Sequence, residues 1–379
     1  MIEKKQFRIT VSDYEIADLK NRLSNIRWPE ASTESGWDQG VPLDYLQELM
    51  RFWMNEYDWL QCENLLNNLE QYSTVIDSQE IIYMHFKSKN TEAKPLIMTH
   101  GWPGSVLEFL DIIDPLINPT AHGGKVHDSF HLVLPTLPGF GFGKKPTSHG
   151  WGVEKIAKTW NELMCSLGYR EFYAQGGDWG AHVTTELALK HTQNCKGIHI
   201  TMPLLSPSAS GKQNLSKFEK DALDAIEYYK NYDSGYSKIQ STKPQTIGYG
   251  LVDSPVAQAT WILDKFWQWT DCSGALENII SKQRLLDNIS YYWFSKSGAS
   301  SARLYWESFK GLSAVSDQIL IPSAVSIFPK EIVRASERWC QERFKNLVYY
   351  QQLDKGGHFA ALEQPLTFVN ELRRAFSLM

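Results

Sequence analysis

The spacing of apolar residues changes along the chain and divides it into helical and strand-like regions. Residues 12–15 form a capping-box sequence, and apolar positions follow at helical spacing as far as Leu23. This pattern predicts an amphipathic helix that ends before Pro29. A second helical region is predicted for residues 42–69, and two strands are predicted for residues 74–86.

Short apolar runs alternate with helical stretches in two further parts of the chain. Such alternation is typical of βαβ units and of a mostly parallel sheet. The stretch between these parts is helical and aromatic, which indicates an inserted lid. The sequence therefore predicts an α/β fold with an N-terminal extension that wraps the core (1–90), a first core segment (91–203), a helical lid (204–318) and a second core segment (319–379).

Asp178 is the strongest candidate for a catalytic residue in the sequence. It lies in Gly176-Gly177-Asp178-Trp179-Gly180, between an apolar run and a helical pattern. The spacing is that of the strand-to-helix elbow of α/β-hydrolases, with Asp where Ser usually stands. Small residues are expected there because the backbone is strained and neighbouring strands press close. An aspartate is already anionic at pH 7 and can displace a leaving group at an sp³ carbon.

Two further candidates follow Asp178 in the order nucleophile, acid, histidine that α/β-hydrolases use. Glu331 comes after the apolar run of residues 319–328, and His358 comes after a later strand-like run. His358 is the predicted general base, and Glu331 is predicted to accept its other N–H and to stabilise the imidazolium. Asp354 is a rival acid, although a position four residues before His358 would point elsewhere on the strand.

The loop after the predicted strand 94–99 completes the candidate site. In α/β-hydrolases this loop supplies one oxyanion N–H, and the residue after the nucleophile supplies the other. The two donors are assigned to the backbone of Trp102 and Trp179, whose side chains would flank the site. His100 is assigned a supporting role in the loop, and His100 and Pro103 are counted as substrate-binding residues.

At these residues the chain resembles the microsomal-type branch of the epoxide hydrolases, which has a long N-terminal extension. The resemblance covers nearly the whole chain, and its most specific part is the lid stretch 234–244, which generic α/β-hydrolases lack. Two departures are visible. No N-terminal membrane anchor precedes the extension, and Ala257 stands where a Gly is common.

The resemblance implies the conversion of apolar epoxides to vicinal diols by water, through a covalent ester on Asp178. It also implies that two lid tyrosines bind and protonate the epoxide oxygen. The first falls on Tyr236 and the second on Tyr305, with Tyr291 and Tyr292 as nearby alternatives. No metal and no organic cofactor is implied.

Two other functions are compatible with parts of the pattern. A haloalkane-type dehalogenase uses the same Asp, His and acid, and the tryptophans at 102 and 179 could hold a halide. The lid stretch around Tyr236 favours an epoxide. A binding protein on a retired hydrolase scaffold is disfavoured, because the triad and the oxyanion loop are both complete. Taken singly, Asp178, His358 and Glu331 could be a turn residue, a loop residue and a solvated helix residue.

The composition limits the classes of protein and ligand that fit the chain. The chain has 379 residues, and 42% of them are hydrophobic, which is sufficient for a substantial core. Many of its aromatic residues lie between residues 225 and 306, which suggests an apolar pocket under the lid. The net charge of −5 argues against binding of nucleic acid.

The expected location is the cytoplasm. The five cysteines are scattered, as in proteins that keep reduced thiols. Residues 1–10 are charged and have no apolar core typical of a secretory signal, and no run of about 18 apolar residues predicts a transmembrane segment. The sequence leaves the oligomeric state open, and a homodimer is compatible with the fold.

Overall fold

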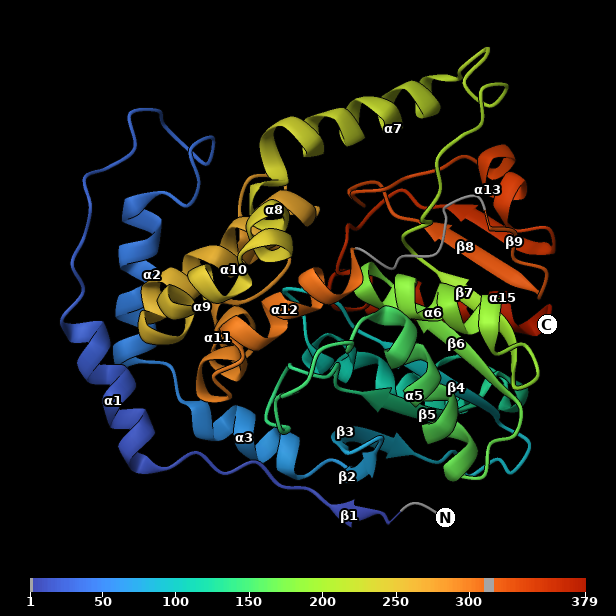
Figure 1. Ribbon diagram of the computed structural model, residues 1–379, viewed down its shortest axis with the longest axis horizontal. Helices are drawn as coiled ribbons and strands as arrows, with labels where there is room; N and C mark the ends of the chain where they lie inside the picture. The colour runs from blue at the N-terminus through green and yellow to red at the C-terminus, as the bar shows by residue number, and fades with distance from the viewer. Residues whose placement is uncertain (1–2, 310–316) are drawn as a thin grey trace.

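A nine-stranded sheet runs through the computed structural model, which describes residues 3–309 and 317–379 (Figure 1). The strand order is β1-β2-β3-β5-β4-β6-β7-β8-β9. The pairs from β1 to β5 along this order are antiparallel, and all later pairs are parallel, which confirms the mostly parallel α/β sheet. The strands are β1 (Lys5–Gln6), β2 (Gln71–Ile76), β3 (Gln79–Phe86), β4 (Lys94–Thr99), β5 (Phe130–Pro135), β6 (Phe172–Gly176), β7 (Cys195–Ile200), β8 (Ser323–Ile327) and β9 (Leu347–Gln352).

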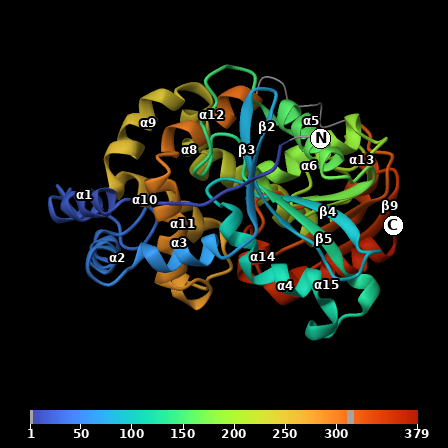
Figure 2. The ribbon, with the colours of Figure 1, turned by 90° about the horizontal axis from the view of Figure 1, so that it is seen from below.

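Helices bury both faces of the parallel strands, as βαβ connections require. Helices α5 and α6 lie on one side of the sheet, and α4, α14 and α15 lie on the other (Figure 2). The last helix begins at Pro365, a residue that is common in the first turn of a helix. The core helices are α4 (Ile113–Ile117), α5 (Val153–Ser166), α6 (Asp178–Lys190), α13 (Glu337–Arg343), α14 (Ala360–Glu363) and α15 (Pro365–Ser377), with the 3₁₀ helices η1 (Val106–Ile112), η2 (Pro119–His122) and η3 (Val126–Asp128) before β5.

Between β7 and β8 the chain leaves the sheet and forms a lid over one end of it (Figure 1). The predicted helical character of this stretch is confirmed for its described residues, whereas the exact domain limits stay predictions. The lid elements are α7 (Lys217–Tyr228), the π-helix η4 (Tyr229–Asp233), α8 (Gly235–Thr242), α9 (Pro244–Asp253), α10 (Pro255–Trp269), the 3₁₀ helix η5 (Leu276–Asn278), α11 (Lys282–Phe294) and α12 (Gly298–Ser308).

The N-terminal extension extends the sheet as well as covering the lid, because it supplies β1, β2 and β3. Helix α1 (Asp13–Ser24) begins with the predicted capping box between Ser12 and Glu15. The helical region expected at 42–69 is in fact two helices, α2 (Leu43–Asn55) and α3 (Trp59–Asn67). The break occurs because Asp58 is extended and its carboxylate accepts the N–H of Leu60, which starts a new helix.

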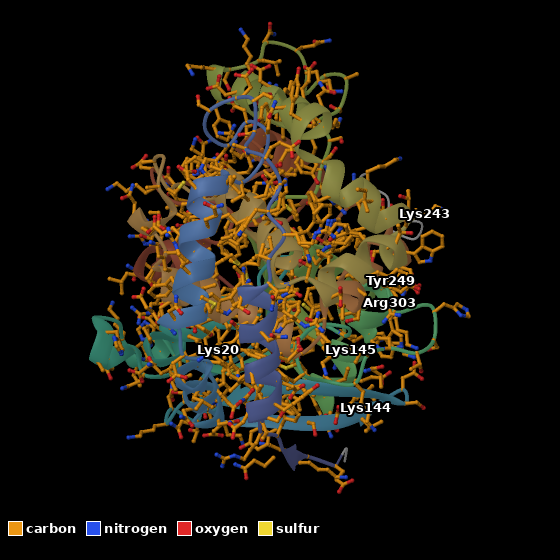
Figure 3. The ribbon with its side chains drawn as sticks, turned by 90° about the vertical axis from the view of Figure 1, so that its left-hand side faces the viewer. Lys20, Lys144, Lys145, Lys243, Tyr249 and Arg303 are labelled. Carbon is orange, nitrogen blue, oxygen red and sulfur yellow. The ribbon has the colours of Figure 1, made fainter. Side chains whose placement is uncertain are left out.

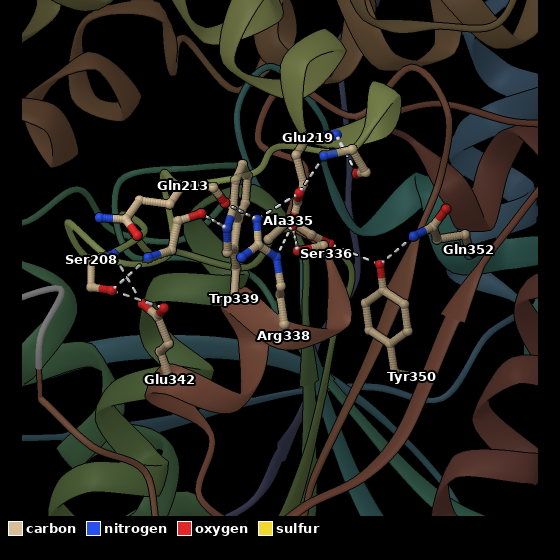
Figure 4. Close-up of polar contacts among 12 residues, drawn as sticks. Ser208, Gln213, Glu219, Ala335, Ser336, Arg338, Trp339, Glu342, Tyr350 and Gln352 are labelled. Atoms are coloured by element: carbon tan, nitrogen blue, oxygen red, sulfur yellow. Dashed lines mark hydrogen bonds and ion pairs between the residues drawn. The ribbon is translucent and has the colours of Figure 1, made fainter.

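Polar contacts fasten the lid where it leaves the core (Figure 4). Glu219 in the first turn of α7 accepts hydrogen bonds from the hydroxyl of Ser336 at 2.6 Å and from Nη2 of Arg338 at 2.8 Å. The Arg338 guanidinium holds the pKa of the Glu219 carboxyl at about 2. Nε1 of Trp339 donates to the carbonyl of Gly211 at 2.8 Å. The start of the lid is therefore tied to helix α13.

Charge is unevenly distributed over the surface. Lys243, Arg303, Lys145 and Lys144 follow one edge of the face that Figure 3 shows, close to Tyr249. Burial, with a smaller effect from Arg303, lowers the pKa of the Lys145 amine to about 8. Lys144 and Lys243 are exposed on this face, whereas Lys145 and Arg303 are partly buried.

Candidate active site

Asp178 stands at a sharp turn between β6 and α6. β6 ends at Gly176, and α6 begins at Asp178 itself. The backbone of Asp178 has a φ of +48°, a left-handed value that is uncommon for a residue other than glycine. A Cβ at Gly101 would lie 2.2 Å from Asp178 Oδ1, and a Cβ at Gly180 would lie 1.9 Å from the carbonyl oxygen of Thr99. Small residues are therefore required around the elbow, as expected.

The structure brings the three predicted triad residues together. His358 Nε2 lies 3.4 Å from Asp178 Oδ2, and His358 Nδ1 lies 2.8 Å from Glu331 Oε1. The Glu331 carboxylate also accepts the N–H of Ile332 at 2.7 Å. Glu331 is buried, whereas the rival acid Asp354 is exposed on the surface. The geometry therefore favours Glu331 as the partner of His358.

The two carboxylates beside His358 favour the charged form of its imidazole. Burial opposes a charge on the imidazole, but Glu331 and Asp178 outweigh this effect and raise the pKa of His358 well above its usual value. Because Asp178 is one of these carboxylates, loss of its charge would lower the pKa of His358 again.

The loop after β4 supplies one N–H to the Asp178 carboxylate. The N–H of Trp102 donates to Asp178 Oδ1 at 2.7 Å. His100 steadies this loop: its Nε2 accepts the N–H of Leu137 at 3.1 Å, so its Nδ1–H is left to donate to the carbonyl of Gly101 at 3.0 Å. The second oxyanion donor, the N–H of Trp179, stays a prediction, as do direct substrate contacts of His100 and Pro103.

Aromatic side chains close over Asp178. Tyr236 from α8 stacks on the Trp102 ring with centroids 4.8 Å apart, and Tyr305 from α12 meets Tyr236 edge to face at 5.8 Å. Tyr305 also contacts the Trp179 ring at 4.7 Å. Tyr236 and Tyr305 are 6% and 3% exposed, and burial is the main reason that their pKa values lie well above normal. Both are therefore neutral hydroxyl groups at physiological pH.

The alternative tyrosines have other partners. The hydroxyl of Tyr292 on α11 donates to the carbonyl of Gly104 at 2.8 Å, and Tyr291 packs edge to face on Phe142. Asn288, one turn earlier on α11, donates to the carbonyl of Pro103 at 2.8 Å. Helix α11 therefore supports the loop after β4 from the lid side. The ring of Tyr305 contacts that of Tyr236, and its role as the second lid tyrosine stays a prediction.

Sequence analysis missed Glu108, which lies in η1 directly after the loop. Glu108, Asp178 and His358 line a cavity of about 20 Å³, enough for one water molecule. Burial, with a smaller effect from Asp178, raises the pKa of Glu108 to about 8. No motif marks this residue, and the only signal in the sequence is a carboxyl group inside an otherwise apolar stretch, Val106-Leu107-Glu108-Phe109.

The cavity that the described residues form beside Asp178 has a volume of about 20 Å³. Aromatic rings pack closely above it, with Tyr236 on Trp102 and Tyr305 on Trp179. The large apolar pocket expected under the lid stays a prediction. Within residues 3–309 and 317–379 no group of His, Cys, Asp and Glu could hold a metal ion, and no helix is long and apolar enough to cross a membrane.

The fold and the elbow define a member of the α/β-hydrolase class with an aspartate at the nucleophile position. A family model described as alpha/beta hydrolase fold matches residues 94–243. A second family model, described as Epoxide hydrolase N terminus, matches residues 4–109.

Comparison with curated proteins gives the family. The chain is 48% identical to a protein of Stigmatella aurantiaca that is provisionally named an epoxide hydrolase, over 98% of this chain and 84% of that protein. It is 34% identical to Epoxide hydrolase 1 of Oryctolagus cuniculus, over 99% of this chain and 89% of that protein. The chain therefore belongs to the epoxide hydrolase family.

Solved structures agree with this assignment. The juvenile hormone epoxide hydrolase from the silkworm Bombyx mori superposes with a TM-score of 0.91 at 30% identity, covering 100% of this chain and 95% of that one. The epoxide hydrolase of Aspergillus niger superposes with a TM-score of 0.87 at 29% identity, covering 99% and 96%. The similarity extends over the extension, the core and the lid.

Proposed function

We propose that this epoxide hydrolase converts apolar epoxides to vicinal diols through a covalent ester on Asp178. The observation that carries the proposal is the position of the Asp178 carboxylate, which lies between the N–H of Trp102 and the ring of His358, under the lid tyrosines. An anionic carboxylate with its own histidine suits displacement at carbon followed by hydrolysis of the ester. The aromatic residues around it favour an apolar substrate.

The first step opens the ring. Tyr236 and Tyr305 bind the epoxide oxygen and give it a proton as the carbon–oxygen bond breaks. Asp178 Oδ attacks a ring carbon and forms a β-hydroxyalkyl ester. Because this step removes the charge of Asp178, His358 loses one of the two carboxylates that raise its pKa and becomes able to release its proton.

The second step hydrolyses the ester. Neutral His358 takes a proton from a water molecule, which attacks the carbonyl carbon of the esterified Asp178, and Glu331 stabilises the imidazolium that results. The N–H groups of Trp102 and Trp179 stabilise the oxyanion. When the tetrahedral intermediate collapses, the bond between the Asp178 carbonyl carbon and the ester oxygen breaks, and the leaving alkoxide takes the proton of the His358 imidazolium. The diol leaves, and one Asp178 oxygen has come from water. The cavity lined by Glu108 is a suitable place for the attacking water molecule.

Mass spectrometry of a trapped ester tests this proposal. His358→Gln should accumulate a covalent adduct of styrene oxide on the peptide that contains Asp178, because the ring can open but the ester cannot be hydrolysed. The wild type should instead make the diol, and Asp178→Asn should make neither. If no adduct forms and the wild type makes no diol from a panel of apolar epoxides, the proposal is wrong. Adducts with haloalkanes in place of epoxides would support the dehalogenase alternative.

The proposed location is the cytoplasm, which agrees with the five free cysteines, four of them buried. A homodimer is proposed as the alternative to a monomer. Sedimentation velocity of the purified protein distinguishes these two states.

A further inference from the structure

A third hydroxyl group lies beside the two lid tyrosines. Tyr229 is the first residue of η4, the five-residue π-helix that continues α7. Its Oη lies 3.1 Å from Oη of Tyr236. π-Helical turns are rare in proteins, and many of those that occur lie at functional sites. The wide turn places Tyr229 in the site, although no motif in the sequence includes it.

The two hydroxyl groups differ in their access to solvent. Tyr236 is 6% exposed, and Trp102 stacks on its ring. Tyr229 is half-buried, and its neighbours Lys230 and Tyr232 are exposed. The hydrogen-bonded pair therefore leads from the buried site toward the surface of the lid.

We propose that Tyr229 positions the proton of Tyr236 for the epoxide and then replaces that proton. This inference rests on the proposed epoxide opening. A phenol has one proton, and an epoxide oxygen can only accept a hydrogen bond. Tyr236 can therefore point its proton at the epoxide only when Tyr229 is the donor between the two hydroxyl groups. A hydroxyl that accepts one hydrogen bond also donates a stronger one.

The proton transfers balance within this chain and the solvent. When the carbon–oxygen bond breaks, its electron pair goes to the oxygen, which takes the proton of Tyr236. Tyr236 takes the proton of Tyr229, and the phenolate left on Tyr229 takes a proton from water at the lid surface. Burial raises the pKa values of both tyrosines, and the hydrogen bond between them raises that of Tyr236 and lowers that of Tyr229. The negative charge is therefore better placed on Tyr229.

The ionisable groups around the pair determine how easily it loses a proton. Lys265 favours the charge, because its Nζ lies 5.0 Å from the centroid of the Tyr236 ring. Asp178 opposes the charge until it becomes an ester. The groups that face the two tyrosines are Asp178 at the start of α6, Asp233 in η4, Lys265 in α10 and Tyr305 in α12.

Ester formation in the His358→Gln background tests the inference, because that background isolates ring opening. Tyr229→Phe keeps the ring and removes the hydroxyl, and Tyr232→Phe in the same π-helix is the matched control, since Tyr232 is 78% exposed. We expect Tyr229→Phe to slow formation of the Asp178 ester with styrene oxide roughly tenfold, the effect of one lost hydrogen bond, and Tyr232→Phe to leave the rate unchanged. Equal rates in the two variants overturn the inference.

The pH dependence distinguishes a proton relay from simple support of the lid. In His358→Gln with Tyr229 intact, the ester should form more slowly at alkaline pH. There Tyr229 is ionised and accepts a hydrogen bond from Tyr236, so the Tyr236 proton no longer points at the epoxide. Tyr229→Phe should move this decline to higher pH. 3-Fluorotyrosine at position 229, which keeps the fold and has a more acidic hydroxyl, should move it to lower pH. If the decline occurs at the same pH in both position-229 variants as in His358→Gln alone, the inference is wrong. If no variant, including the parent, forms an ester, the proposed function fails and this inference fails with it.

Discussion

At the scale of single residues, the charge state of His358 should control the second half of the reaction. Glu331 and Asp178 raise the pKa of His358 against the effect of burial, and the ester intermediate retains only Glu331. Hydrolysis of the ester should therefore slow as the pH falls through the remaining pKa of His358. Glu331→Gln should move this decline to lower pH and slow hydrolysis roughly a hundredfold, because the imidazolium loses its partner.

Decay of the ester that wild type and Glu331→Gln form in a single turnover, followed by quenched-flow mass spectrometry from about pH 5 to pH 9, measures this effect. Asp354→Asn is the matched control, since Asp354 is an exposed carboxylate near the same loop. A decline at the same pH in wild type and Glu331→Gln would mean that Glu331 does not determine the pKa of His358.

Glu108 should weaken the fold as the pH rises. Burial, with a smaller effect from Asp178, raises its pKa from 4.5 to about 8. The folded state therefore retains a proton that the unfolded state releases, and the free energy of unfolding falls by up to about 1.4 kcal/mol per pH unit in that interval. Glu108→Gln should show no such loss. Its stability relative to wild type should increase between about pH 5 and pH 8 in urea unfolding, and a constant difference would contradict this prediction.

The residues of the site were predictable to different degrees. Asp178, Glu331 and His358 could be identified because the elbow spacing and the order along the chain are local features of the sequence. Glu108 and Tyr229 could not, because their positions depend on a 3₁₀ helix and a π-helix that no apolar period indicates.

At the scale of elements, an ion pair holds the π-helix on α10. The side chains of Asp233 and Lys265 are 8% and 6% exposed, and Trp269 Nε1 donates to Asp233 Oδ2 at 2.7 Å. Lys265→Met would leave the Asp233 carboxylate buried without its cation, which should reduce the free energy of unfolding by about 3 kcal/mol or more.

An exposed ion pair in the same lid serves as the control. Lys217 and Asp221 on α7 are 89% and 47% exposed, so Lys217→Met should cost less than about 1 kcal/mol. Urea unfolding of both variants measures the difference. Equal losses would mean that the buried pair does not stabilise the π-helix more than a surface pair does.

The elements themselves were largely predictable. The capping box at Ser12, the strand before the oxyanion loop and the last helix at Pro365 all follow from short local signals. The break between α2 and α3 was missed because the apolar period continues through Asp58, and only the cap at that residue separates the helices.

At the scale of the whole molecule, α11 links the N-terminal extension to the catalytic loop. One side of this helix receives hydrogen bonds from the extension, from Trp53 to Ser290 at 3.0 Å and from Tyr57 to Asp287 at 3.0 Å. The other side holds the loop after β4, through the contact of Tyr292 with Gly104. The extension supplies none of the candidate site residues, yet it contacts the helix that holds the loop. This connection between distant segments was not visible in the sequence.

Tyr57→Phe tests this support, since it removes one hydroxyl and keeps the ring. Asp287 is buried, burial raises its pKa, and the hydrogen bond from Tyr57 lowers it. The free energy of unfolding of the variant should be lower by about 1.5–3 kcal/mol at pH values where Asp287 is ionised. The loss should be smaller at acidic pH, because burial of a protonated Asp287 costs less free energy. Urea unfolding at about pH 5 and pH 8 measures this, with Tyr14→Phe as a control because Tyr14 is 80% exposed.

The activity of the same variant shows how far the support reaches. If α11 only stabilises the fold, Tyr57→Phe should form diol at the wild-type rate at low temperature and lose activity as it unfolds on heating. If α11 also fixes the loop of Trp102, whose N–H contacts Asp178 Oδ1 at 2.7 Å, ester hydrolysis should slow even in fully folded protein, because the oxyanion would lose a well-placed donor. We expect the first result, since Asn288 and Tyr292 still hold the loop when the hydroxyl of Tyr57 is absent.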